Sequence, residues 1–204
     1  MIKEPFLSRY PSHFHLNPTI KAFITAEMFF WSGWNFLFPL LGIFVVSEVD
    51  GGTLQVAAMA YSLHLIARVS TELLSGRYIS KGGDKLKLAT AIVGAIILGL
   101  GYLALLAVRY VPLLYLVYIV LGIGFGISSP AKFSLFSMHL DKNKESTEWS
   151  FYDASSLMGM AISGVVGGVI ASRFGFDVLF IVASVVNLIG IFPYFFLLGK
   201  YSRN

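Results

Sequence analysis

Three ionisable residues recur at four-residue spacing in a stretch that is otherwise largely apolar. His64, Arg68 and Glu72 share one face if this stretch forms a helix. Ionisable groups are costly in a lipid bilayer, and they are tolerated where they face a bundle interior, a partner charge or a water-filled cavity. The spacing therefore predicts a helix face that lies in a bundle interior, against a partner charge or beside a water-filled cavity, and these residues are candidates for a proton or substrate pathway.

Glu27 adds a carboxylate to the preceding apolar run. At ~1.5 Å per residue it lies about 9 Å beyond Lys21, and Arg68 lies about 12 Å before Gly76 on an antiparallel neighbour. We therefore expect Glu27 and Arg68 to pair, with His64 nearby and Glu72 competing for the arginine. Two interpretations stay open. A carboxylate that exchanges an arginine for water changes its proton affinity, whereas a static ion pair only holds two helices together.

Other polar and aromatic residues fall in the same apolar runs. Trp31 and Trp34 share a helix face with Glu27 and lie near mid-membrane, which favours a cavity or a helix interface over the headgroup region. The further candidates for the proton or substrate pathway are Asn35, Lys132 and Asp153.

The composition indicates the elements that must hold these residues. Of the 204 residues, 56% are hydrophobic and 13% are charged, whereas soluble domains keep about 25% charged residues. Residues 1–20 suit an interfacial segment, and residues 21–200 a transmembrane domain. Each of its six apolar runs has the ~20 residues of a membrane span. These runs are about 21–47, 53–79, 86–108, 111–140, 148–172 and 177–199.

The basic residues predict how these spans are oriented. Eleven of the fifteen Lys and Arg residues fall on one side of the expected membrane, and only Arg109 and Arg173 on the other. Positive charge favours the cytoplasmic side. We therefore expect a multi-pass protein of the plasma membrane with both termini in the cytoplasm. Because these charges lie in short loops, they do not predict a nucleic-acid surface.

Metal and cofactor sites have little support in the sequence. The chain contains no cysteine, which excludes disulfides and thiolate ligands. His13 and His15 form a pair without further ligands, whereas metal sites usually need three or four. We expect no metal, no cofactor and no enzymatic activity.

Small residues recur in the fifth span at helical spacing. Such residues let helix backbones approach closely, and we expect them to serve packing. They are Gly159, Ser163, Gly164, Gly167 and Gly168.

The loop between the second and third spans resembles a signature of the major facilitator superfamily. In that family the signature is a glycine, three residues of any type, Asp-Arg, one residue, a glycine, one residue and then a basic residue. The matching residues here are Gly76, Lys81, Gly83 and Lys85, and Ser80 stands where the aspartate is expected. The run from Ser163 to Gly168 is similar to the family's Gly-Pro-x-x-Gly-Gly element without its proline.

The resemblance implies an all-α membrane fold equivalent to one half of a major facilitator transporter. That half is a 3+3 bundle of inverted three-helix repeats, in which spans one and four would line a central path and spans three and six would face lipid. The implied function is proton-coupled transport of a small organic solute by alternating access. The implied partner is a second copy of the chain in a parallel homodimer, and the residues do not select one solute.

Two other classes of function remain open. A non-transporting membrane subunit or assembly factor could keep the same fold, because fold does not imply function. An intramembrane serine protease would need a nucleophile next to a placed base. The sixth span contains no histidine, which argues against it.

Overall fold

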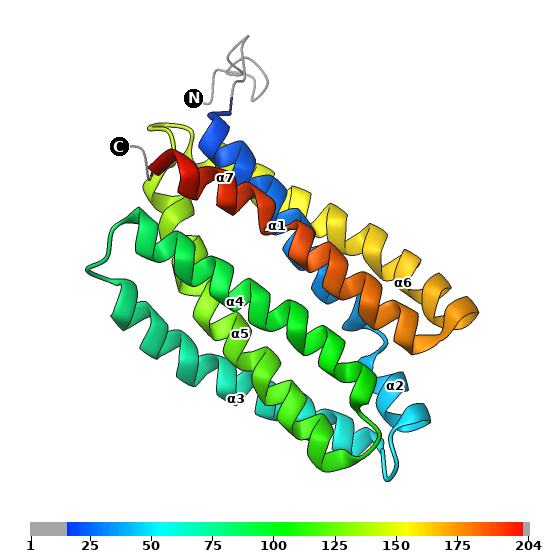
Figure 1. The fold of residues 1–204 in the computed structure, drawn as a ribbon. Helices are drawn as coiled ribbons and strands as arrows, with labels where there is room; N and C mark the ends of the chain where they lie inside the picture. Colours follow the sequence, from blue (N-terminus) through cyan, green and yellow to red (C-terminus); the bar gives the residue numbers. More distant parts are fainter. Residues whose placement is uncertain (1–15, 202–204) are drawn as a thin grey trace, which may run out of the picture.

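The computed structural model describes residues 16–201 of the chain. Most of the expected interfacial segment, including His13 and His15, lies outside these residues. The helices are α1 (Pro18–Leu37), α2 (Leu41–Glu48), α3 (Leu54–Ile79), α4 (Asp84–Ala104), the 3₁₀ helix η2 (Leu105–Ala107), α5 (Val111–Met138), α6 (Glu145–Ile189) and α7 (Phe192–Tyr201) (Figure 1).

The first apolar run forms two helices instead of one. Asn17 caps α1, and its side-chain oxygen accepts a hydrogen bond from the Ile20 N–H at 2.8 Å. The helix ends at Leu37, and α2 begins at Leu41 after a turn that contains Pro39. Proline has no N–H and cannot continue a helical ladder, which explains why the expected span 21–47 is divided.

Helix α6 contains a reversal of the chain at Gly175. This residue has φ 83° and ψ 174°, a backbone conformation that glycine adopts without a steric penalty. The helical segments before and after it run side by side in opposite directions (Figure 1). They correspond to the expected segments 148–172 and 177–199, the second of which continues into α7 after a break at Gly190 and Ile191.

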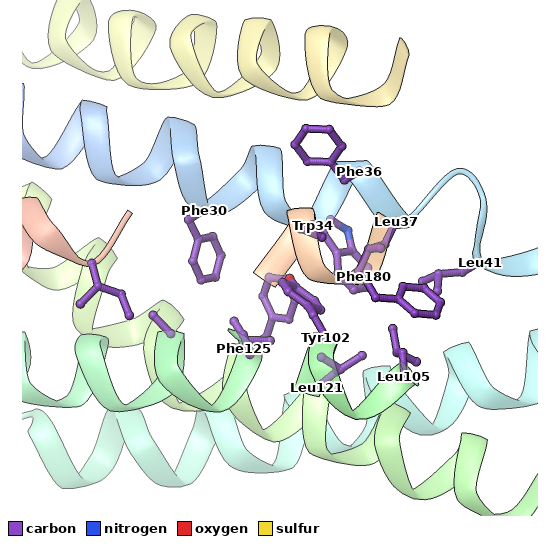
Figure 2. Packing of buried hydrophobic residues seen from close by; sticks show 14 of the residues in the cluster. Phe30, Trp34, Phe36, Leu37, Leu41, Tyr102, Leu105, Leu121, Phe125 and Phe180 are labelled. Carbon is purple, nitrogen blue, oxygen red and sulfur yellow. The ribbon is translucent and has the colours of Figure 1, made fainter. Parts of the chain in front are cut away.

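The helices pack through a continuous apolar core. The most extensive contacts join α1 to α6, α3 to α5 and α4 to α5. Figure 2 shows part of this core, where Phe30 and Trp34 of α1 approach Phe125 of α5. The Trp34 and Phe125 rings lie 5.0 Å apart with their planes at 80°, an edge-to-face arrangement that aromatic rings favour.

Four of the described helical stretches are long and apolar enough to cross a membrane. They are Pro18–Glu48, Asp84–Ala107, Val111–Met138 and Glu145–Gly199, and the last contains the reversal at Gly175. Helix α3 is 26 residues long but is not among them; His64, Arg68 and Glu72 lie within it. The division into two inverted repeats of three spans stays a prediction.

The basic loops gather at one end of the bundle. The α3–α4 and α5–α6 connections lie at the end where α1 begins and α7 ends, away from α2 (Figure 1). The connections at the opposite end are joined by a hydrogen bond from the Asp50 N–H to the Arg109 carbonyl at 2.8 Å. The charge asymmetry of the sequence is thus an asymmetry between the ends of the fold, and which end is cytoplasmic stays a prediction.

Candidate functional site

Glu27 lies at the centre of a buried polar cluster drawn from four helices. Its side chain is fully buried on α1. The ammonium nitrogen of Lys132, on α5, lies 3.0 Å from Oε1 and 3.1 Å from Oε2. The Tyr152 hydroxyl of α6 donates to Oε2 at 2.8 Å, and the Tyr194 hydroxyl of α7 donates to Oε1 at 2.7 Å. Each carboxylate oxygen therefore lies next to the ammonium group and accepts a hydrogen bond from one tyrosine.

Lys132 is held from two sides. Its ammonium group contacts Glu27 and lies 3.0 Å from the centre of the Phe30 ring, one turn further along α1. A cation over an aromatic face is stabilised by the ring's negative potential. With 2% of its side chain exposed, Lys132 is a buried charge that depends on these two partners.

The expected pairing of Glu27 with Arg68 is wrong. Arg68 pairs with Glu72 on its own helix, where Nε and Oε2 are 3.4 Å apart, and its guanidinium lies 5.0 Å from the centre of the Phe125 ring. Depth along two antiparallel helices indicated that Glu27 and Arg68 could meet. It did not indicate that α3 packs chiefly on α5, or that Lys132 of α5 would meet Glu27 in place of Arg68.

His64 belongs to an aromatic stack instead of the polar cluster. Its ring lies 5.2 Å from the Trp34 ring with the planes at 15°, and 6.0 Å from the Tyr61 ring at 12°. The side chain is 2% exposed, and Nδ1 has no hydrogen-bond partner among residues 16–201. This stack joins α1 to α3 near Phe125.

A cleft of about 630 Å³ opens beside the buried cluster. Its lining comes from α1, α5 and the first half of α6. The residues that line it are Trp31, Phe133, Trp149, Ser150, Tyr152, Asp153, Ser156, Leu157 and Met160. Tyr152 belongs both to this lining and to the partners of Glu27. The cleft and the buried carboxylate therefore share one residue, Tyr152.

Asn35 and the small residues of the fifth expected span lie at the contact between α1 and α6. The Asn35 side-chain amide donates to the Met160 carbonyl at 2.6 Å. A methyl group on Gly159 would meet the Met28 carbonyl at 3.0 Å, and one on Gly167 would meet the Phe36 carbonyl at 2.7 Å. Ser163 is buried between these two glycines.

Two more small residues have looser surroundings. A methyl group on Gly164 would lie 3.0 Å from the Asn35 amide nitrogen, whereas one on Gly168 would meet nothing within 4 Å. Gly168 thus borders open space in the described part of the chain.

The residues of the signature-like loop end α3 and begin α4. Gly76 faces Pro130 of α5, and Gly83 is the extended residue before α4. The Ser80 hydroxyl donates to the Arg77 carbonyl at 2.8 Å, while Lys81 and Lys85 are exposed.

The α5–α6 loop at the same end is tied to α1. The Asn17 amide donates to Asp141 Oδ1 at 3.0 Å and to the His139 carbonyl at 3.2 Å. The hydrogen bond from Asn17, aided by nearby Lys144, holds the pKa of the Asp141 carboxyl below its usual range. Asp141 therefore stays charged, and this end of the bundle is closed by a polar network.

Tyr152 and Tyr194 were missed from the sequence, although a signal for them exists. Tyr152 lies seven residues after Glu145, and Tyr194 lies six residues before Lys200. Both therefore lie about 9–11 Å along the helix from those charged residues, much as Glu27 lies about 9 Å beyond Lys21. A buried tyrosine hydroxyl needs a hydrogen-bond partner, so tyrosines at the depth of a carboxylate are candidates to bind it. Among the described residues, no group of three His, Asp or Glu side chains is placed to hold a metal ion.

One family model, one curated relative and one solved structure resemble this chain. The family model described as Major Facilitator Superfamily matches residues 23–204. The uncharacterized MFS-type transporter YttB of Bacillus subtilis (strain 168) is 29% identical over 167 residues, which are 81% of this chain and 40% of that protein. The in meso crystal structure of the POT family transporter PepTSo matches with a TM-score of 0.73 at 16% identity, over 89% of this chain and 37% of that one. At 16% identity, the match to the solved structure shows the fold alone. The chain spans about 40% of the length of its curated relative.

Proposed function

The chain belongs to the major facilitator superfamily, and on this basis we propose that it forms one half of a secondary transporter for a small organic solute. Family membership supports a role in transport across a membrane and argues against an enzyme. The chain matches 40% of its curated relative and 37% of the solved transporter. The proposed transporter would therefore contain a second unit next to this one.

The observation that carries the proposal is that one residue, Tyr152, contacts both the cleft and the buried carboxylate. Tyr152 lines the cleft and donates to Glu27 Oε2 at 2.8 Å. A solute in the cleft would contact the Tyr152 ring and change how its hydroxyl is held. Glu27 would then lose or gain a donor, and the proton affinity of a carboxylate follows the donors around it.

We further propose that transport is coupled to protons through the ionised and protonated states of Glu27. Ionised Glu27 is held by Lys132 and both tyrosines, and these contacts join α1 to α5, α6 and α7. Protonated Glu27 has no charge to attract Lys132, so the contacts between these helices weaken. A proton that binds more tightly in one of two helix arrangements shifts the equilibrium between them. Such a difference in proton affinity between the two arrangements is what coupling of transport to protons requires.

A second copy of the chain, inserted in the same direction, would supply the other unit. The two halves of family members are related by an axis along the membrane normal, so a parallel copy can take the second place. The basic α3–α4 and α5–α6 loops lie at one end of this fold, which disfavours insertion in both directions. Exposed apolar side chains lie on the outer faces of α3 and α6, among them Val69 and Leu157.

The proposal is tested with the variant Glu27→Gln in proteoliposomes. A thermal-shift screen of organic solutes against the purified chain first selects a solute, and its uptake is then measured with and without a pH gradient. Glutamine keeps the size of Glu27 and still accepts hydrogen bonds, but it cannot exchange a proton. We expect the variant to bind the solute and to lose the accumulation that the pH gradient drives.

Glu48→Gln is the matched control. It makes the same chemical change at an exposed residue at the end of α2, and its uptake should equal that of the unmodified chain. If uptake by Glu27→Gln still follows the pH gradient, Glu27 is not the coupling carboxylate. An unmodified chain that binds solutes but moves none would favour a non-transporting subunit.

A further inference from the structure

The lining of the cleft carries one uncompensated negative charge. Asp153 is its only acidic residue, and none of the described residues that line it is basic. Asp153 is exposed, and no described residue forms an ion pair with it. The cleft is therefore electronegative, although the whole chain has a formal charge of +4.

The nearby charges behind the wall of the cleft cancel in pairs. Glu27 and Lys132 neutralise one another, and Tyr152 separates them from the cleft. Arg68 is paired with Glu72 and lies on the Phe125 ring. Phe125 in turn contacts Trp31, at 6.0 Å between ring centres. These pairs leave Asp153 as the charge that a bound solute would meet.

The position of Asp153 requires a wet or charged environment. It lies eight residues after the start of α6, which is about 12 Å along the helix. A carboxylate at that depth is tolerated only next to water or a positive charge. Trp149, one turn earlier on the same face, also lines the cleft.

Aromatic rings form the rest of the wall. Trp31, Phe133 and Trp149 come from three different helices. Trp149 is fixed by an edge-to-face contact with Phe136, at 4.7 Å between ring centres. Aromatic rings around a carboxylate attract organic cations, because the ring faces and the carboxylate both present negative potential. A volume of about 630 Å³ lies within the range of pockets for drug-sized ligands.

From this geometry we propose that the cleft binds organic cations, with Asp153 as the counter-ion and Trp31, Phe133 and Trp149 as the aromatic walls. The proposal rests on the proposed function, and it names the substrate class of the same site. An ammonium group would lie next to Asp153, and its apolar body would lie between the rings, near Tyr152. The cation would thus occupy the side of Tyr152 that faces away from Glu27.

The test measures binding of one cation and its neutral isostere to the purified chain. Benzyltrimethylammonium and neopentylbenzene have the same shape and differ only in charge. Binding is followed by the change in tryptophan fluorescence, because Trp31 and Trp149 line the cleft. We expect the cation to bind more tightly than the neutral compound, and phenylmethanesulfonate, an anion, to show no binding.

Variants assign this preference to Asp153. Asp153→Asn should weaken binding of the cation about tenfold and leave binding of neopentylbenzene unchanged, while Asp153→Glu should restore most of the affinity for the cation. Asp177→Asn makes the same change at an exposed residue near the reversal at Gly175, and it should leave affinity unchanged. Equal binding of the cation and its isostere, or an Asp153→Asn variant with full affinity for the cation, would overturn the proposal.

These experiments distinguish failure of the binding proposal from failure of the transport proposal. If the chain binds the cation through Asp153 but moves no solute, the cation site stands and the transport proposal is wrong. If the chain transports solute but its affinity for the cation does not depend on Asp153, the transport proposal stands and the cation site is wrong.

Discussion

At the scale of residues, the molecule tolerates a buried carboxylate by surrounding it with donors from separate helices. Glu27 has Lys132, Tyr152 and Tyr194 as partners, and each comes from a different element. Such a cluster depends on all its members, because removal of one partner leaves another buried group uncompensated. The loss of stability caused by a substitution therefore depends on which buried charge it leaves without a partner.

The substitution Lys132→Met should destabilise the chain by about 3–5 kcal/mol, because it leaves the Glu27 charge buried without a cation. The double variant Glu27→Gln/Lys132→Met should recover most of this loss, since neither charge then remains. Thermal unfolding in detergent measures both. Additive effects of the two single substitutions would show that the residues do not interact.

At this scale the sequence predicted the members of the site better than their contacts. Glu27 and Lys132 stood out because charged residues are rare in apolar runs. The partner of Glu27 was predicted wrongly because depth leaves several candidates on different helices. The two tyrosines are amphipathic residues common near membrane surfaces, so their types alone did not mark them as partners.

At the scale of elements, close approach of α1 and α6 depends on small side chains at particular turns. Gly159 and Gly167 are two turns apart on α6 and face the backbone of α1. This contact holds Asn35 against the Met160 carbonyl and positions Trp31 at the cleft. The spacing of these glycines was visible in the sequence. The break at Pro39 and the reversal at Gly175 set where the helices end.

The pair of variants Gly167→Ala and Gly168→Ala separates helix contact from helix propensity. A methyl group on Gly167 would lie 2.7 Å from the Phe36 carbonyl, so α1 and α6 must move apart, whereas one on Gly168 meets nothing within 4 Å. We expect Gly167→Ala to lower stability by about 1–3 kcal/mol. Gly168→Ala should raise it by up to about 1 kcal/mol, because alanine favours helix. Thermal unfolding of the two proteins compares them directly, and equal effects would contradict the close contact.

At the scale of the whole molecule, composition and charge predicted more than local pattern did. The low charged fraction and the gathering of basic residues in short loops predicted a multi-pass membrane protein, and the loop from Gly76 to Lys85 predicted the family. For helix α3, in contrast, composition does not predict a membrane span. Its ionisable residues lower its hydropathy, so length and composition alone do not identify it as a span. The way the helices associate depends on contacts between distant residues, which a single sequence does not display.

The arrangement of the whole molecule also determines which helices of two copies would contact one another. In a parallel dimer with an axis along the membrane normal, α3 of one copy lies against α6 of the other, by analogy with the two halves of family members. Val69 on α3 is ten residues before the end of its helix, and Ala154 on α6 is nine residues after the start. Both are exposed and lie about 14–15 Å from the same end of the bundle.

The double variant Val69→Cys/Ala154→Cys should therefore form a disulfide-linked dimer in native membranes, in a chain that has no other cysteine. Val69→Cys/Val93→Cys is the matched control, since Val93 is half exposed at a similar depth on α4, which should face lipid. Non-reducing electrophoresis after mild oxidation gives the yield of dimer. We expect most of the first variant, and little of the control, to migrate as a dimer. Equal yields would mean that the cross-links report random collision, and the parallel dimer would then lose its support.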